Sequence, residues 1–396
     1  MNDVALEYVL FDGAPFDFPP ALLPVMPPFR LAALRWGADT RRATPAWAAG
    51  GRHYGRARYA LRDAYRMSGV GPAGALLAPA YHCRTMLDPA LALGAPVRLY
   101  AVDESLRPDL GDIARQLERT DQPVKAVLVT HYFGFAYDLR ELAALCRARD
   151  VALVEDCAQS MPLATPSNGM GVTGRWCVAS PWKFFPCEDG GVLWSGTGQT
   201  LDLPPLRAPG TRGELAQLRR MGERARLHLP RDGRGLAAVA ERAGDPREQV
   251  AQAVSRRLEG PSQEYQRERE SISCAVVSRW IVAHSDIAEV VAVRRANYER
   301  WARAASDLPS ARAPWPVLGP NDTPYMFPLL IEHPERHFAP LKRAGLPIFR
   351  WDSMAASACT TAARYRLGLL HLPCHQALTD EELEWMIRTV GGVLGG

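Results

Sequence analysis

Short apolar runs alternate with longer stretches of helical pattern between residues 55 and 195, and this alternation strongly constrains the fold. The strand-like runs span residues 75–78, 96–102, 126–130, 151–155, 177–179 and 191–195. The helical stretches span residues 58–67, 84–93, 109–119 and 138–149. Such alternation predicts an α/β fold with a mostly parallel sheet and helices on both faces. Ligands of such sheets bind beyond the carboxyl ends of the strands.

The length of the chain predicts more than one domain. It has 396 residues, and a single hydrophobic core usually stops growing at about 250–300 residues. We assign residues 1–50 to an N-terminal arm, 51–255 to a large domain and 256–396 to a smaller domain. The arm is rich in proline, so we expect it to be irregular and to pack against another part of the protein. The connection between the domains is expected within residues 196–260, which are rich in Gly, Pro and Arg.

The C-terminal part has the pattern of a smaller α+β domain. A long helix is predicted over residues 287–304, and strands are predicted over 326–331 and 346–349. The last helix is expected to begin with a capping box, in which Thr379 is the N-cap and Glu382 the third helical residue.

Composition excludes several classes of protein. The 47 basic and 43 acidic residues leave a net charge of only +4, and the arginines are scattered, so we expect no nucleic-acid partner. We find no run of about 18 apolar residues and no signal-peptide pattern, so we expect no membrane association. The eight cysteines form no Cys-x-x-Cys pair, which favours the reducing cytoplasm.

Lys183 is one of only three lysines, and its neighbours are mostly apolar and aromatic. Burial lowers the pKa of a lysine amine, which makes the amine available as a nucleophile near neutral pH. Asp156 lies at the carboxyl end of the predicted strand 151–155. An amine that can form a Schiff base and a carboxylate that can hold a pyridinium proton are what pyridoxal 5'-phosphate (PLP) requires. Lys183 and Asp156 are therefore our candidate catalytic and cofactor-binding residues.

Gln159 follows Asp156 by three residues and is placed to donate a hydrogen bond to the 3-oxygen of a pyridine ring. Asp156 could instead serve as a helix cap, because Asp is a good N-cap residue. Its combination with Lys183 and with the glycine pair Gly190-Gly191 favours the cofactor site.

A phosphate site is predicted where the helix over residues 58–67 begins. Ala57 and Arg58 stand at its first turn, where free backbone N–H groups bind phosphate and the arginine could add a charged contact. A basic surface turn is the alternative for this segment. Ser180, three residues before Lys183, could donate a further hydrogen bond to the phosphate.

Three other motifs are set aside. Residues 169–174 match G-x-G-x-x-G, but they precede a strand rather than a helix, so we predict a turn there instead of a dinucleotide site. His371 and His375 flank Pro373 without an accompanying carboxylate, so we expect a loop before the final helix and no metal site. A hydrolase would need a G-x-S-x-G elbow, which the chain lacks.

With these motifs in place, the chain resembles the PLP-dependent sugar aminotransferases of the DegT/DnrJ/StrS type. The resemblance covers residues 55–200 and, more weakly, 294–390. Its residues are Val102-Asp103, 126–134, 154–159 and Lys183 with Gly190-Gly191. It implies PLP-dependent transferase fold type I, with a mostly parallel seven-stranded sheet in the large domain and a smaller α+β C-terminal domain. It also implies that Lys183 carries the Schiff base, that Asp156 pairs with the pyridinium, that Gln159 meets the 3-oxygen, and that the protein is a homodimer.

The chain departs from the family pattern at three cofactor positions. Ala57 and Arg58 replace the usual Gly-Thr pair. By alignment, Cys83, next to His82, stands where an aromatic side chain usually stacks on the PLP ring. Ser180 lies three residues before the lysine, whereas the family serine usually lies five before it.

We therefore expect a PLP-dependent aminotransferase that moves an amino group from an amino acid, glutamate in our first choice, to a keto acceptor such as a keto sugar. A PLP enzyme that catalyses dehydration, decarboxylation or carbon–carbon bond formation is the alternative, because the ring-stacking and phosphate positions are altered. A non-catalytic partner or sensor with this fold is the third hypothesis, and the Lys183–Asp156 pair argues against it.

Overall fold

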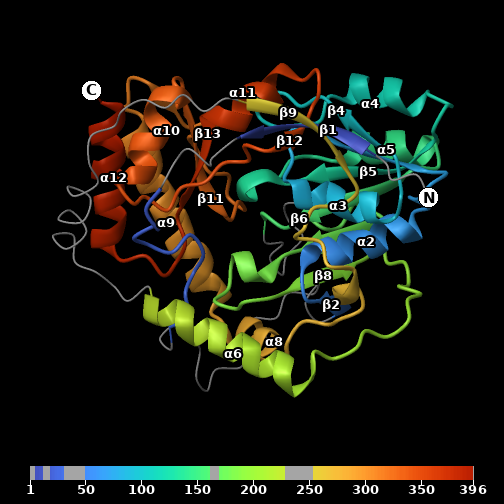
Figure 1. The fold of residues 1–396 in the computed structure, drawn as a ribbon, viewed down its shortest axis with the longest axis horizontal. Coiled ribbons are helices and arrows are strands. Elements are labelled where there is room, and N and C mark those ends of the chain that lie inside the picture. The colour runs from blue at the N-terminus through green and yellow to red at the C-terminus, as the bar shows by residue number, and fades with distance from the viewer. Residues whose placement is uncertain (1–4, 12–17, 31–49, 161–168, 228–252, 396) are drawn as a thin grey trace.

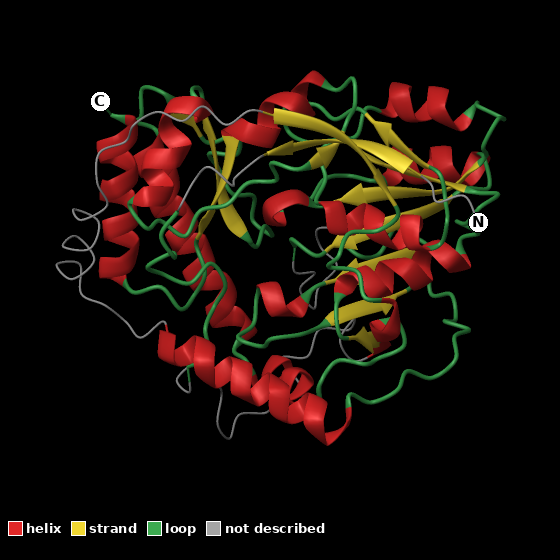
Figure 2. Cartoon of the chain, viewed as in Figure 1, coloured by secondary structure: helices red, strands yellow, loops and turns green. Residues whose placement is uncertain are grey.

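The computed structural model describes residues 5–11, 18–30, 50–160, 169–227 and 253–395 (Figure 1). A large sheet covered by helices occupies the right of the view. The helices α9 (Ile287–Ala305), α10 (Pro334–Arg343) and α12 (Asp380–Leu394) lie together on the left. Figure 2 shows the same arrangement by type of secondary structure, with strands on the right enclosed between helices.

The central sheet has seven strands, as the family resemblance implies. In spatial order they are β2 (Arg52–Tyr54), β8 (Gly191–Trp194), β7 (Trp176–Ala179), β6 (Ala152–Cys157), β5 (Val124–Thr130), β3 (Ala75–Pro79) and β4 (Val97–Tyr100). The strands from β7 to β4 pair in parallel, whereas β8 is antiparallel to both β7 and β2. The prediction of a mostly parallel sheet is therefore confirmed.

Side chains alternate between two hydrophobic cores along these strands. On β5, Ala126 and Leu128 belong to one core, and Val127 and Val129 belong to the other. The first core also contains residues of α2 (Ala57–Met67) and α3 (Arg84–Ala92). The second contains residues of α4 (Leu110–Leu117) and α5 (Arg140–Ala148). Both faces of the sheet are covered, which explains why its strands are almost continuous apolar runs.

The N-terminal arm is more regular than the sequence suggests. β1 (Ala5–Phe11) is the central strand of a second, three-stranded sheet, between β12 (Met354–Ala355) and β9 (Ala253–Glu259). Our prediction of an irregular arm is thus wrong for these seven residues. The assigned boundary between residues 255 and 256 falls inside β9, and α6 (Gly210–Leu227) occupies part of the expected connection.

The C-terminal region contains a third sheet, formed by β10 (Ala311–Arg312), β11 (Met326–Ile331) and β13 (Leu369–Pro373). Its helices are α8 (Val276–His284), α9, α10, α11 (Thr360–Gly368) and α12. The predicted long helix and the strand 326–331 are confirmed. The Thr379–Glu382 capping box is present, with both of its hydrogen bonds formed.

Two predictions in this region are wrong. The segment 346–349 is no strand, because only Phe349 forms an isolated bridge, to His371. His371 itself lies in β13 and not in a loop before the final helix, because the run 369–373 pairs antiparallel with β11. Pro373 is the last residue of β13, where the missing N–H group is tolerated.

Within the described part of the chain, every helix is too short or too polar to cross a lipid bilayer.

Gly191, the first residue of β8, allows the backbone of this strand to approach the first turn of α2 closely. A Cβ atom at this position would lie 2.4 Å from the amide nitrogen of Ala57 and 2.4 Å from the carbonyl carbon of Arg56. Gly190 donates from its amide to the carbonyl of Gly55 at 2.9 Å and has a φ of +141°, which favours glycine. The close approach of these backbones explains why two glycines follow the lysine segment.

We predict that Gly191→Ala lowers the free energy of unfolding by about 1–3 kcal/mol, because backbone must move to admit the methyl group. Thermal unfolding measures the change. Gly222→Ala, inside α6 with open space around its Cα, is the matched control and should stabilise the protein by up to about 1 kcal/mol. A Gly191→Ala variant as stable as the wild type would contradict the prediction.

Candidate active site

Asp156 stands at the carboxyl end of β6, in the middle of the central sheet. Parallel pairing sets it opposite Thr130 of β5 on one side and Val178 of β7 on the other. The side chain is 2% exposed, and Oδ1 accepts a hydrogen bond from the amide of Ala158 at 2.8 Å. Burial raises the pKa of this carboxyl, and the charge of Lys183 opposes the rise. Asp156 therefore lies at the edge of the sheet where we expected it.

Lys183 ends a short 3₁₀ helix, Pro181–Lys183, that follows β7 directly. Its Nζ lies 5.2 Å from the centre of the Tyr325 ring. Burial lowers the pKa of the Lys183 amine, while the charge of Asp156 works in the opposite direction. Since β6 and β7 are neighbouring parallel strands, the segments after them bring the lysine and the aspartate within electrostatic reach.

Gln159 provides a buried hydrogen-bond donor beside this pair. It is 1% exposed, and its Oε1 accepts from the amide of Phe133 at 2.9 Å. Its Nε2 has no partner among the described residues. An unpaired buried donor is costly, so it points to an acceptor that is supplied by a bound group. The 3-oxygen of a pyridoxal ring fits this requirement, and with Lys183 and Asp156 the residues present fit PLP.

His82 and Cys83 differ in what they can offer a ligand. The His82 ring is fully buried, with Nδ1 close to the carbonyls of Pro79 and Ala80 and Nε2 accepting from the amide of Ala355. Since backbone groups use both ring nitrogens, His82 fixes the local backbone. Cys83 is partly buried and lies within electrostatic reach of Lys183. Its Sγ is 2.8 Å from Thr85 Oγ1, and burial raises the pKa of the thiol.

The first turn of α2 has the features of an anion site. Arg56 is its N-cap residue and makes no capping hydrogen bond, and the first turn contains no acidic side chain. Ala57 and Arg58 are the first two helical residues. The Arg58 guanidinium contacts the carbonyl oxygen of Glu264 at 2.6 Å and its carboxylate at 3.0 Å. The positive charge of Arg58 also helps to lower the pKa of the Lys183 amine.

Ser180 is 3% exposed and lies between β7 and the 3₁₀ turn Pro181–Lys183, which we call the lysine turn. Its carbonyl accepts from the amide of Lys183 at 3.1 Å. The guanidinium of Arg56 stacks over the Trp182 ring at 4.6 Å, so the start of α2 and the lysine turn are in contact. This contact could not be predicted from the sequence, because its two residues lie more than 100 positions apart.

A cavity of about 190 Å³ opens beside the same turn of α2. Three of its lining residues are arginines, namely Arg56, Arg220 and Arg269. Asp189, the acidic residue among them, already accepts hydrogen bonds from Ser278 Oγ and from the amide of Ala275. The cavity therefore offers an excess of positive charge to a ligand.

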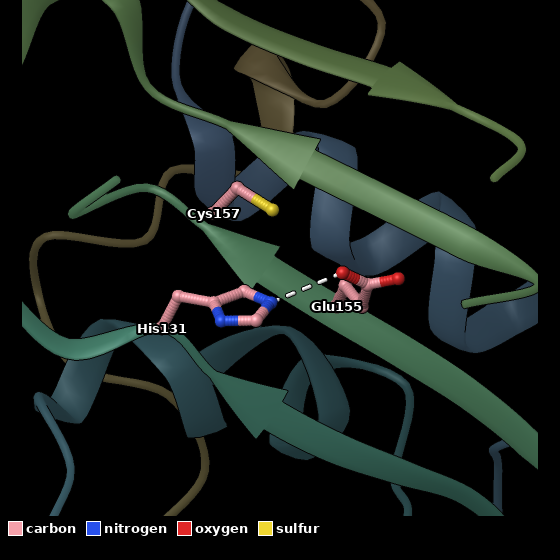
Figure 3. A group of neighbouring side chains, drawn as sticks. All are labelled: His131, Glu155 and Cys157. Atoms are coloured by element: carbon pink, nitrogen blue, oxygen red, sulfur yellow. Dashed lines mark hydrogen bonds and ion pairs between the residues drawn. The ribbon is translucent and has the colours of Figure 1, made fainter. Parts of the chain in front are cut away.

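Glu155, which our reading of the sequence overlooked, organises the segment below the site. Its carboxylate accepts from the backbone amides of Gly171 at 2.8 Å, Thr173 at 2.8 Å and Gly174. His131 Nε2 lies 3.1 Å from Oε2, and both side chains are fully buried (Figure 3). The prediction that residues 169–174 form a turn before a strand is therefore confirmed.

His131, Glu155 and Cys157 place one ligand atom each within 4.8 Å of one another, which is close enough for a metal ion (Figure 3). The Glu155 carboxylate, however, is already bound by His131 Nε2 and by three backbone amides, and Cys177 Sγ donates to Oε1 at 3.8 Å. A carboxylate has about four lone-pair sites, so it has little left to offer a cation. We interpret the group as a buried hydrogen-bonded cluster that holds the turn 169–174 in place.

The two histidines that flank Pro373 have separate partners. His371 Nε2 lies 3.0 Å from Tyr81 Oη, and His375 Nε2 lies 2.9 Å from the carbonyl of Pro24. Burial lowers the pKa of each ring to about 3. Both rings are therefore neutral at physiological pH.

Comparison with known proteins identifies the class of fold first. TlmJ, an aminotransferase from Streptoalloteichus hindustanus, superposes with a TM-score of 0.62 at 22% identity, over 94% of this chain and 99% of that one. NtdA from Bacillus subtilis, solved with bound cofactor PMP, superposes with a TM-score of 0.58 at 12% identity, over 92% of this chain and 79% of that one. The chain thus has the fold of the PLP-dependent aminotransferases.

The sequence comparison then points to a particular family. Residues 56–204 match the DegT/DnrJ/EryC1/StrS aminotransferase family, in agreement with the resemblance drawn from the motifs. GDP-perosamine synthase of Vibrio cholerae is 26% identical over 149 residues, which are 36% of this chain. The match spans 39% of that relative's length. Asp156, Gln159 and Lys183 all lie within residues 56–204, the segment that matches the family.

The shifted pKa of the Glu155 carboxyl leads us to expect that the stability of the protein depends on pH. Burial alone would raise its pKa, but the hydrogen bond and charge of His131 and the backbone amides outweigh burial and lower it. A lowered folded-state pKa gives stability that is present above the unfolded-state value of about 4.3 and lost as pH falls through the folded-state value.

We predict that Glu155→Gln lowers the free energy of unfolding by about 3–5 kcal/mol at pH 7, because it breaks a buried pair and turns an NH₂ group toward amide donors. The loss should begin to shrink below about pH 4.3, where the carboxylate of the unfolded wild type becomes protonated, and should shrink further as pH falls through the lower folded-state pKa. Denaturant unfolding over a pH series measures both effects. Asp121→Asn, at an exposed carboxylate paired with Arg98 and Arg119, is the control and should change little. A loss that is equal at all pH values would refute this account.

Proposed function

We propose that this protein is a PLP-dependent aminotransferase. The observation that carries the proposal is the convergence, beyond the ends of β6 and β7, of Lys183 with a lowered amine pKa, the buried Asp156 carboxylate and the unpaired Nε2 of Gln159. It is supported by the family match over residues 56–204 and by the fold shared with a protein that binds PMP.

PLP, when bound, withdraws electrons from the Cα of an amino acid and carries the amino group between donor and acceptor. Asp156 would hold a proton on the pyridine nitrogen. A cationic ring nitrogen beside the buried carboxylate would favour the charged form of Asp156, as Lys183 already does. Gln159 Nε2 would donate to the 3-oxygen and fix the orientation of the ring.

The Lys183 amine has two tasks in this proposal. Its lowered pKa increases the uncharged fraction of the amine, so Nζ would be available as a nucleophile toward the cofactor aldehyde. Nζ would also be the base that takes the Cα proton of an amino donor and the acid that returns it. Tyr325, whose ring faces Nζ at 5.2 Å, helps to exclude water from the amine.

The remaining cofactor positions are proposed as follows. The first-turn amides of Ala57 and Arg58, together with Ser180, would bind the phosphate. Cys83 would lie against a face of the ring, and His82 would hold the backbone that presents Cys83.

We propose glutamate as the amino donor and a keto sugar as the acceptor. Two curated relatives are named GDP-perosamine synthase and UDP-N-acetyl-3-dehydro-alpha-D-glucosamine 3-aminotransferase. The arginine-lined cavity beside α2 would suit an acceptor with an anionic group. We further propose a homodimer and a cytoplasmic location, the latter supported by eight cysteines that are all free thiols.

The thiol of Cys83 favours one alternative. It would leave a face of the ring less covered than an aromatic side chain does, which would admit a second reactant. A PLP enzyme that catalyses dehydration, decarboxylation or carbon–carbon bond formation is therefore the second candidate.

Cofactor binding is tested by the visible spectrum of the purified protein loaded with PLP. We expect a long-wavelength band that borohydride bleaches, with covalent retention of the cofactor on Lys183. Lys183→Ala should lack the band. Lys342→Ala is the matched control and should keep it, because Lys342 Nζ donates to the carbonyl of Ile348 outside the site. A band that survives in Lys183→Ala would refute the assignment of the lysine.

Transamination is tested by adding candidate amino donors to the PLP-loaded protein. We expect glutamate to remove the long-wavelength band and to release about one equivalent of 2-oxoglutarate per chain. Lys183→Ala should slow this step by about 10²–10⁴-fold, because it removes the group that moves the proton. No half-reaction with any common amino acid would reject transamination and favour the second candidate.

A further inference from the structure

Arg294 of α9 is a fully buried arginine whose partners are all neutral. Its side chain is 0% exposed, and burial lowers the pKa of its guanidinium to about 10. Its hydrogen bonds reach Gln376 Oε1 at 2.9 Å and the backbone carbonyls of Pro324 at 3.1 Å, Tyr325 at 3.0 Å, Lys183 at 3.2 Å and Phe184 at 3.5 Å. Buried arginines are usually paired with carboxylates, and no carboxylate contacts this one in the described part of the chain.

Two of these five acceptors, the carbonyls of Lys183 and Phe184, belong to the lysine segment, which comprises the lysine turn and Phe184. The carbonyl of Phe184 is held twice, because Gln376 Nε2 also donates to it at 2.8 Å. The guanidinium of Arg294 lies 4.7 Å from the centre of the Phe184 ring. On the other side of the segment, Arg56 stacks over Trp182 at 4.6 Å. The lysine turn is therefore fixed from the large domain through Trp182 and from the C-terminal region through its carbonyls.

The direction of a carbonyl group and the direction of the Cα–Cβ bond of the same residue are coupled through the backbone dihedrals. Fixing the carbonyl of Lys183 therefore restricts where its side chain points. The Tyr325 carbonyl is bound to the same guanidinium, and the Tyr325 ring faces Lys183 Nζ. One buried group thus binds the backbone of both the lysine and the tyrosine whose ring faces its amine.

We propose that Arg294 is a positioning residue that aims Lys183 at its site and keeps its amine out of water. The inference rests on the proposed function, since it concerns the nucleophile of that reaction. Loss of Arg294 would leave the carbonyls of Lys183 and Tyr325 without this donor, the turn would relax, and water would reach Nζ. The amine would then recover a pKa closer to that of an exposed lysine.

The test is the pH dependence of lysine labelling in the full-length protein, freed of bound carbonyl compounds by hydroxylamine. Trace acetic anhydride acetylates uncharged amines, and mass spectrometry gives the rate at each of the three lysines. Lys125, which is exposed on β5, is the internal reference. The pH midpoint of labelling reports the amine of Lys183 without any need for catalytic activity.

For Arg294→Met we expect the midpoint of Lys183 to rise, and each unit of rise lowers labelling at neutral pH about tenfold relative to Lys125. Arg294→Lys keeps a donor, so its labelling midpoint for Lys183 should lie between those of the wild type and of Arg294→Met. Arg295→Met is the matched control, because Arg295 lies on the same helix and, among the described residues, donates to the carbonyls of Gly319 and Asp322, at 2.8 and 2.7 Å, rather than to the lysine segment. It should lower the melting temperature and leave the midpoint of Lys183 unchanged.

A folded Arg294→Met variant with the wild-type midpoint would overturn the inference, as would an equal shift in Arg295→Met. If Arg294→Met does not fold, Gln376→Ala takes its place, because Gln376 binds both Arg294 Nε and the Phe184 carbonyl. A smaller rise is expected there, and no rise would count against the proposal. A wild-type Lys183 that labels like Lys125 would instead contradict the proposed function.

Discussion

The parallel pairing of β6 with β5 and β7 is the constraint on which the site depends. It sets Asp156 at the same level as Thr130 and Val178, so the segments after the three strands leave the sheet together. A slip of one residue would turn Asp156 to the opposite face and exchange it with Glu155. The two acidic neighbours would then trade environments, and neither the carboxylate beside Lys183 nor the anchor of the turn 169–174 would survive.

Much of this arrangement could be predicted from the sequence, because its signals are local. The strands of the central sheet are buried on both faces, so each is a compact apolar run between helical stretches. Asp156 and Gln159 follow one such run, and Lys183 follows the next. The positions of these residues relative to the strand ends then follow from the rule that ligands bind at the carboxyl edge of a parallel sheet.

What could not be predicted depends on contacts between distant segments. β1 is recognisable only through its partners, which lie about 250 and 350 residues further along the chain. β13 was hidden because Pro373 suggested a loop, although a proline can end a strand. Arg294 has the sequence context of an ordinary surface arginine on a helix, and its burial arises only when α9 packs against the lysine segment. The role of Glu155, next to Asp156, could not be predicted either, because its partners are His131 and the turn 169–174, which lie in other segments.

The hydrogen bonds of Arg294 to the lysine segment also affect the order in which parts of the site form during synthesis. The central sheet needs only the first half of the chain, so it can form while the rest is still on the ribosome. The carbonyls of Lys183 and Phe184, however, gain these donors only when α9 and then Gln376 have been made, and both come later in the chain than the sheet. A nascent chain that stalls between the sheet and Gln376 would therefore carry a complete sheet whose lysine turn is not yet held in place.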